Sequence, residues 1–88
     1  MKRTGEAVLR DVGGQALLVP IGAKVGDLNA LITLNATGRR VWELLAEDLS
    51  ADSLVSKIAA EFRADPETVR PDILSFVERL RGWGLLEP

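Results

Sequence analysis

Cysteine and histidine are both absent from this 88-residue chain. Without cysteine it can form no disulfide, thiolate nucleophile or thiolate metal site, and without histidine it has no imidazole base or ligand. The 13 carboxylates are spread along expected helix surfaces and form no pair that would share an apolar pocket. We therefore expect a protein that is not an enzyme, with no catalytic residues, no metal and no cofactor.

Long apolar runs and an excess of positive charge are also lacking. No run approaches the roughly 20 residues of a membrane span, and the first 14 residues carry charges inside their only apolar patch, unlike a secretory signal. A net charge of −2 is unfavourable for a nucleic-acid binder. The composition predicts one cytoplasmic domain over residues 1–88, with residues 1–5 frayed and no membrane or nucleic-acid partner.

The chain is organised around residues 28–45, LNALITLNATGRRVWELL. Side chains alternate through 28–34, which predicts a strand with one buried face. Asn35 is a good helix N-cap, and apolar residues then recur at helical spacing from Ala36 to about Asp48. A strand should therefore run directly into a helix, with no loop between them.

Two further strands are expected before this corner, at 7–12 and 15–21, joined by the two-residue turn Gly13-Gly14. In the first of them, Val8 and Val12 share one face. Pro20 has no N–H to donate, so it should mark the end of the second strand or a free edge.

Two further helices should follow the corner. The first covers 51–63 after the N-cap Ser50, with an apolar stripe at 54, 55, 58, 59 and 62. The second begins at Pro66 after the N-cap Asp65 and ends near Gly82 or Gly84. Its core stripe is predicted at 69, 73, 76 and 80, and Pro71 should tilt its first turn. The order predicts an α+β fold like a winged helix-turn-helix, with three N-terminal antiparallel strands followed by three helices.

The segments LNATGRRVWELL and DPETVRPDILSFVERLRGWGLL resemble the PqqD family of small peptide chaperones, over about residues 14–87. One departure is Ala46-Glu47-Asp48-Leu49, where members often have Asp-Gly between the first two helices. The resemblance implies a precursor-peptide recognition element, which binds the leader of a ribosomally made peptide and presents it to a modifying enzyme, often of the radical SAM type. Biosynthesis of pyrroloquinoline quinone (PQQ) or of a related peptide product would be its setting. The implied binding mode adds the leader as a strand to the edge of the third strand, beside the third helix.

The residues themselves suggest where such a peptide would bind. The third strand has no lysine, proline or inward charge to block pairing at its edge. Beside the core stripe of the third helix runs a second stripe, in which two apolar residues are flanked by arginines; it suits an acidic, amphipathic peptide. The candidate peptide-binding residues are Asn29, Ala30, Leu31, Ile32, Thr33, Arg70, Ile73, Leu74, Val77 and Arg81.

Other interpretations remain open from sequence alone. A neighbour could cover the strand, and Leu74 and Val77 could simply widen the core contact. A winged-helix DNA-binding regulator is disfavoured because residues 66–82 hold three acidic residues against three arginines. The open edge could also serve self-association, so a monomer and a homodimer are both possible.

Overall fold

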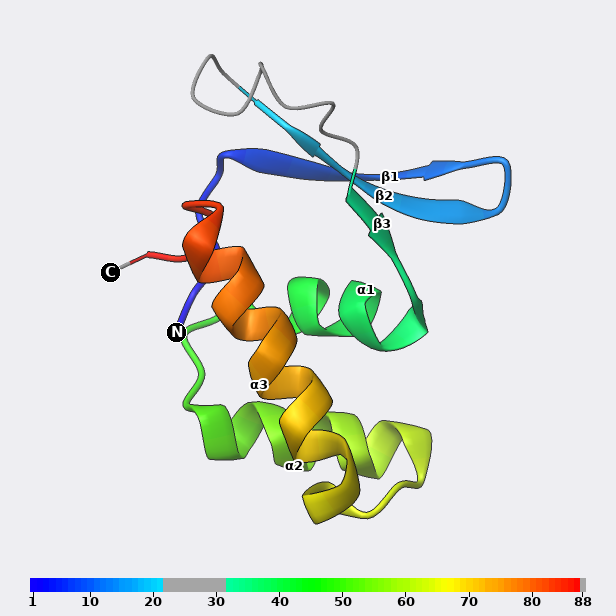
Figure 1. Ribbon diagram of the computed structural model, residues 1–88, viewed down its shortest axis with the longest axis vertical. Helices are drawn as coiled ribbons and strands as arrows, with labels where there is room; N and C mark the ends of the chain where they lie inside the picture. The colour runs from blue at the N-terminus through cyan, green and yellow to red at the C-terminus, as the bar shows by residue number, and fades with distance from the viewer. Residues whose placement is uncertain (22–31, 88) are drawn as a thin grey trace.

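The computed structural model describes residues 1–21 and 32–87 (Figure 1). The elements follow the order β1 (Ala7–Val12), β2 (Gln15–Pro20), β3 (Ile32–Leu34), α1 (Ala36–Leu44), α2 (Ala51–Phe62) and α3 (Pro66–Gly82). The strands form one antiparallel sheet in the order β1-β2-β3. The expected α+β architecture is confirmed. Positions 28–31 of the expected third strand lie outside the described residues, and so do the candidates Asn29, Ala30 and Leu31.

The β1–β2 hairpin has the turn that its two glycines predict. Gly13 and Gly14 take φ values of 58° and 83°, and Val12 pairs with Gln15 across them. Two consecutive positive φ values fit a type I′ turn, whose twist matches that of the strands it joins. Pro20 is the last residue of β2, as expected.

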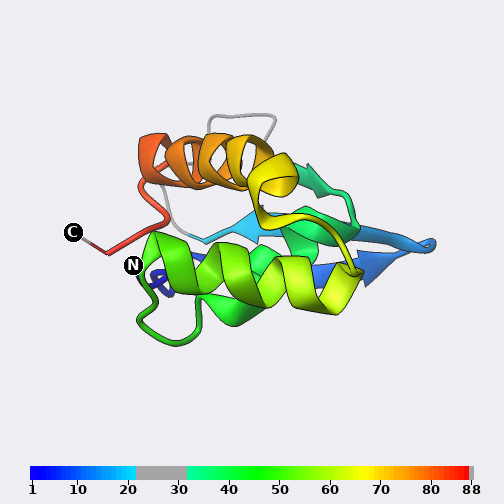
Figure 2. The same ribbon diagram turned by 90° about the horizontal axis from the view of Figure 1, so that it is seen from below.

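All three helices lie on one side of the sheet: they are below it in Figure 1 and in front of it in Figure 2, which is seen from below. The inward face of the sheet contributes Ala7, Leu18 and Leu34 to the core. Val8 and Val12 point the other way and are 36% and 58% exposed. Val8 and Val12 therefore do share one face, and it is the outer face of the hairpin.

Each helix begins at its expected N-cap. The side-chain oxygens of Asn35, Ser50 and Asp65 accept from the backbone N–H groups of Gly38 (2.7 Å), Ser53 (3.1 Å) and Glu67 (3.0 Å). Each bond satisfies one N–H that would otherwise lack a partner in the first turn.

The helix ends differ more from expectation. The first helix ends at Leu44, before the predicted Asp48, because the Ala46 and Glu47 N–H groups bond to carbonyls three residues back and tighten the chain into a turn. α2 ends at Phe62, with Arg63 left-handed at φ 53°. α3 is one continuous helix that includes Pro71.

The core lies between the sheet and the helices. Its largest fully buried side chains are Trp42, Leu18, Leu45, Leu54, Ile58, Ile73, Leu80, Leu85, Val41 and Val55. For two residues the predicted burial is wrong. Phe62, at the end of α2, is 41% exposed, whereas Val77 is 2% exposed and belongs to the core. The buried positions of α3 are thus 73, 77 and 80, with Val69 and Phe76 half-buried beside them.

Residues 1–5 are not the frayed start that the sequence predicted. The Arg3 N–H donates to the Leu45 carbonyl at 2.8 Å, and the Thr4 N–H donates to the Leu85 carbonyl at 2.9 Å. The Arg3 guanidinium lies 5.2 Å from the centroid of the Trp42 ring and donates to the Trp42 carbonyl at 3.0 Å. The N-terminal segment is therefore tied to both α1 and the C-terminal tail, through partners that local sequence does not reveal.

Within 1–21 and 32–87, no helix is both long enough and apolar enough to span a bilayer.

Candidate functional site

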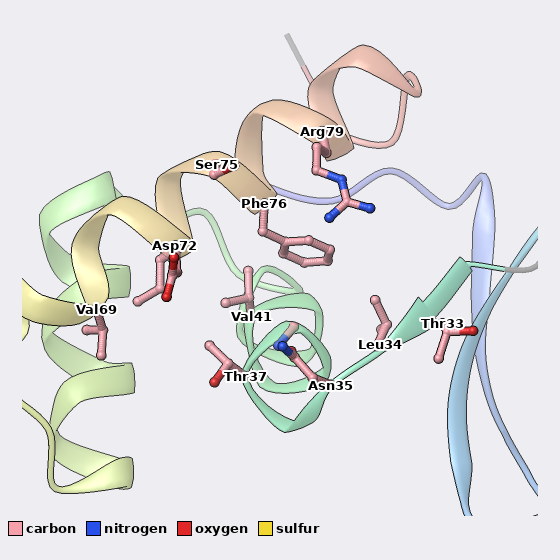
Figure 3. Close-up of a pocket in the computed structure, with 12 residues that line it drawn as sticks. Thr33, Leu34, Asn35, Thr37, Val41, Val69, Asp72, Ser75, Phe76 and Arg79 are labelled. Atoms are coloured by element: carbon pink, nitrogen blue, oxygen red, sulfur yellow. The ribbon is translucent and has the colours of Figure 1, made fainter.

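A groove of about 420 Å³ separates β3 from α3, with the first turn of α1 between them (Figure 3). Two regions far apart in the chain meet here: the continuous stretch from β3 through the strand-to-helix corner into α1, and the long last helix. The groove is lined by Thr33, Leu34, Asn35, Thr37, Gly38, Val41, Val69, Asp72, Ile73, Ser75, Phe76 and Arg79. Its mixed apolar and polar lining suits a peptide better than a purely apolar ligand.

The register of the sheet shows which way the backbone of β3 faces. The pair next to a two-residue hairpin turn is hydrogen-bonded, and such pairs alternate along antiparallel strands. Since Val12 and Gln15 are that pair, Ala16 and Leu18 of β2 direct their N–H and C=O groups toward β3, opposite Leu34 and Ile32. Thr33 lies between these two partners of β2.

The backbone N–H and C=O of Thr33 therefore point away from β2, toward the groove. Its side chain is exposed, on the outer face of the sheet opposite Leu17. β3 is the last strand in the described sheet. Such an edge offers a donor and an acceptor at the spacing that a further strand would need.

The opposite wall of the groove is one face of α3. Val69 and Phe76 are half-buried and present apolar surface, and the Phe76 ring extends toward β3 (Figure 3). Gly38 explains how α1 comes so near this ring. A Cβ at Gly38 would lie 3.2 Å from Oδ1 of Asn35 and 3.6 Å from Cζ of Phe76, so a larger residue would press on both the N-cap and the wall.

Two charged side chains share this face of α3. Asp72 points toward α1, and Arg79 reaches toward β3 (Figure 3). The Arg79 guanidinium lies 5.2 Å from the centroid of the ring of Trp83, the residue that directly follows α3. Within the described part of the chain, neither Asp72 nor Arg79 forms an ion pair.

The other candidate arginines of α3 have carboxylate partners. Arg70 donates to Asp52 of α2 at 2.9 Å, and this hydrogen bond raises the pKa of Arg70 above its ordinary value. Arg81 lies 3.5 Å from Glu78, one turn back on the same helix. Arg70 and Arg81 therefore make their contacts outside the groove.

Of the candidate peptide-binding residues that the structure describes, some therefore line the groove and others do not. Thr33 and Ile73 line the groove, and Ile32 lies beside them in β3 with its backbone facing β2. The second stripe of the last helix does not line the groove: its members are Arg70, Leu74, Val77 and Arg81. For Val77 the alternative interpretation holds, since it packs in the core.

The groove-facing residues of α3 that sequence reasoning missed are Val69, Asp72, Ser75, Phe76 and Arg79. The predicted second stripe lies on one side of the core stripe, whereas the groove residues lie on the other side, roughly 165° around a helix of 3.6 residues per turn. Periodicity predicts Val69 and Phe76 in the core, whereas in the structure they are half-buried at its margin, where they form the wall of the groove. One feature of the sequence could have indicated these residues. The edge of β3 is uncharged and partly apolar, and the face of α3 that forms the opposite wall of the groove must face that edge.

The part of the chain that the structure describes contains no cluster of three or more acidic residues arranged to hold a metal ion. The groove offers the backbone N–H and C=O of Thr33, apolar surface at Val69 and Phe76, and the charged side chains of Asp72 and Arg79.

Residues 6–86 match the family described as Coenzyme PQQ synthesis protein D (PqqD). This chain belongs to the PqqD family. The match spans both β3 and α3, so the groove lies within the family domain.

The PqqD-family fold is also seen in a solved structure, TbiB1 in complex with the TbiA(beta) leader peptide. That structure is 29% identical to this chain, with a TM-score of 0.73, and the similarity covers 99% of this chain and 95% of that one. No curated protein matches the chain.

Proposed function

We propose that this PqqD-family chain is a non-catalytic, cytoplasmic recognition element for the leader of a ribosomally made precursor peptide. The observation that carries the proposal is the edge of β3, whose Thr33 backbone faces a groove walled by α3. The likeness to TbiB1, solved with a leader peptide, supports the same assignment.

In this proposal an extended leader segment adds to the sheet beside β3. Its backbone pairs with the N–H and C=O of Thr33, and its side chains contact Val69 and Phe76 across the groove. Backbone pairing supplies affinity with little dependence on sequence, and the wall supplies selectivity. Ordering a flexible peptide offsets much of the gain, so we expect a Kd in the sub-micromolar to micromolar range, or about −8 kcal/mol.

The bound precursor is then presented to a separate modifying enzyme, for which a radical SAM enzyme of PQQ or related peptide biosynthesis is our first candidate. This chain has no cysteine to bind an iron–sulfur cluster, so that chemistry falls to the partner. The monomer presents its β3 edge to the leader, and self-association through the same edge would compete with leader binding.

Electrostatics argue against duplex DNA as the ligand. Arg70 and Arg81 are paired with carboxylates, and Asp72 stands in the groove, where it would repel phosphate.

The decisive experiment is calorimetric titration of this protein with the leader encoded by a short precursor gene beside its own. Thr33→Pro removes the N–H that the added strand needs, and proline is tolerated on an edge strand. We expect it to weaken binding at least tenfold. Thr33→Val keeps the N–H and should bind like the wild type, which makes it the matched control.

Circular dichroism and thermal melts must first show that both variants fold. The proposal is wrong if folded Thr33→Pro binds as tightly as Thr33→Val. It is also wrong if mixed-sequence duplex DNA displaces the leader at physiological salt.

A further inference from the structure

Asp72 and Arg79 are the two charged side chains that α3 contributes to the groove. They are seven positions apart on one exposed helix face, which is two turns or about 10 Å along the axis. Every described ion pair of the last helix involves Arg70 or Arg81, on a different face. The groove thus contains a negative end and a positive end, and the described residues neutralise neither.

The two ends have fixed positions relative to β3. β3 and α3 run in opposite directions (Figure 1). Arg79 extends toward β3, whereas Asp72 is directed toward α1, which follows β3 in the chain (Figure 3). A peptide strand lying in the groove would pass both charges in succession. Since a strand advances about 3.3 Å per residue, roughly three residues separate the points where it passes them.

The direction in which the peptide strand runs then decides which order of charges along the peptide complements Asp72 and Arg79. Both described strand pairings are antiparallel, and antiparallel pairs are the more stable per residue. A fourth strand antiparallel to β3 runs parallel to α3, so it meets Asp72 first and Arg79 later.

We propose that Asp72 and Arg79 read the polarity of the bound peptide. The preferred segment carries a basic residue on its N-terminal side, facing Asp72, and an acidic residue about three positions later, facing Arg79. This inference rests on the proposed function, to which it adds the charge pattern of the ligand and the direction in which the ligand binds.

The local structure suits Arg79 for this role. Its guanidinium lies against the Trp83 ring, and a side chain already held in one region loses less freedom on pairing with a ligand carboxylate. Arg70, by contrast, already has Asp52 and would have to release it. Complementary charges at a partly exposed groove chiefly set selectivity and association rate, so each pair should change affinity by about three- to tenfold.

The test is to select binders of the intact protein from a display library of random 15-residue peptides. The best binder is then titrated against the protein. We expect selected sequences to place Lys or Arg before Asp or Glu at a spacing of three or four residues. A synthetic peptide with those two charges exchanged should bind roughly tenfold or more weakly to the wild type.

Variants of the protein sharpen the test. Arg79→Glu should weaken the selected peptide about tenfold, whereas Arg81→Glu, an equal change of charge outside the groove, should have little effect. The double variant Asp72→Arg with Arg79→Asp should reverse the preference and favour the exchanged peptide. These sites are exposed, so the variants should fold, and circular dichroism can verify this.

The outcomes separate the two proposals. If Thr33→Pro abolishes binding of the selected peptides but their charges show no order, or if the double variant does not change the preference, the polarity inference is wrong and the proposed function stands. If display yields no peptide whose binding depends on Thr33, both are wrong.

Discussion

Trp42 shows how single residues of this small domain take on several structural roles. It is 1% exposed, at the centre of the core between the sheet and the helices. Arg3 covers its ring and donates to its carbonyl, which ties the N-terminal segment to α1. One side chain thus links the first residues of the chain to the helix that forms the end of the groove.

We predict that Trp42→Ala lowers the free energy of unfolding by about 3–5 kcal/mol, a large share of the total for a small domain. The half-buried Trp83 is the matched control, and Trp83→Ala should cost clearly less. Urea melts followed by circular dichroism measure both. A loss below about 1 kcal/mol for Trp42→Ala would contradict its place in the core.

At the scale of elements, the corner between β3 and α1 is the critical joint. Asn35 directly follows β3, caps α1 and lines the groove, so local structure and the proposed binding site meet at one residue. Ser50 caps α2 in the same way but lies outside the groove. The two caps therefore form a natural pair for comparison.

We predict that Asn35→Ala and Ser50→Ala each destabilise the fold by about 1 kcal/mol, the usual cost of losing an N-cap bond. Only Asn35→Ala should also weaken leader binding, because it loosens the corner that positions the Thr33 edge. Thermal melts and calorimetric titration of both variants provide the comparison. Equal binding by the two variants would show that the corner does not control the edge.

At the scale of the whole molecule, ion pairs join different elements of the fold. Arg39 bonds to Asp11 of β1, Arg40 bonds to Glu61 of α2 at 2.6 Å, and Arg70 bonds to Asp52. The hydrogen bond from Arg40 lowers the pKa of Glu61 below its ordinary value of 4.5. These pairs are exposed, so each contributes modestly.

The lowered pKa of Glu61 fixes the sign of a pH effect. Unfolded Glu61 binds a proton at higher pH than folded Glu61, so its contribution is complete above the unfolded pKa and is lost as pH falls through the folded value. We predict that stability declines as pH falls below about 4.5 and that Glu61→Gln makes this decline shallower. Urea melts across this range test it. A slope unchanged in Glu61→Gln would show that the pair with Arg40 contributes nothing.

Features that depend only on neighbouring residues could be predicted from the amino-acid sequence alone. The Gly13-Gly14 turn follows from the ease with which glycine takes positive φ, and the caps at Asn35, Ser50 and Asp65 follow from short side chains that reach an N–H two or three residues ahead. Alternation followed by helical spacing placed the strand-to-helix corner. These signals operate within a few residues, so no tertiary information was needed to find them.

The rotation of α3 about its own axis, in contrast, follows from packing against other elements. Apolar residues cover a wide arc of this helix, and periodicity alone does not say which margin of the arc meets α2 and which meets the groove. Packing settles it: Val77 enters the core, Arg70 turns to α2, and Phe76 with Arg79 faces β3. The partners of residues 1–5 are likewise distant in sequence. Contacts between segments far apart in the chain leave no local pattern, and the groove consists of such contacts.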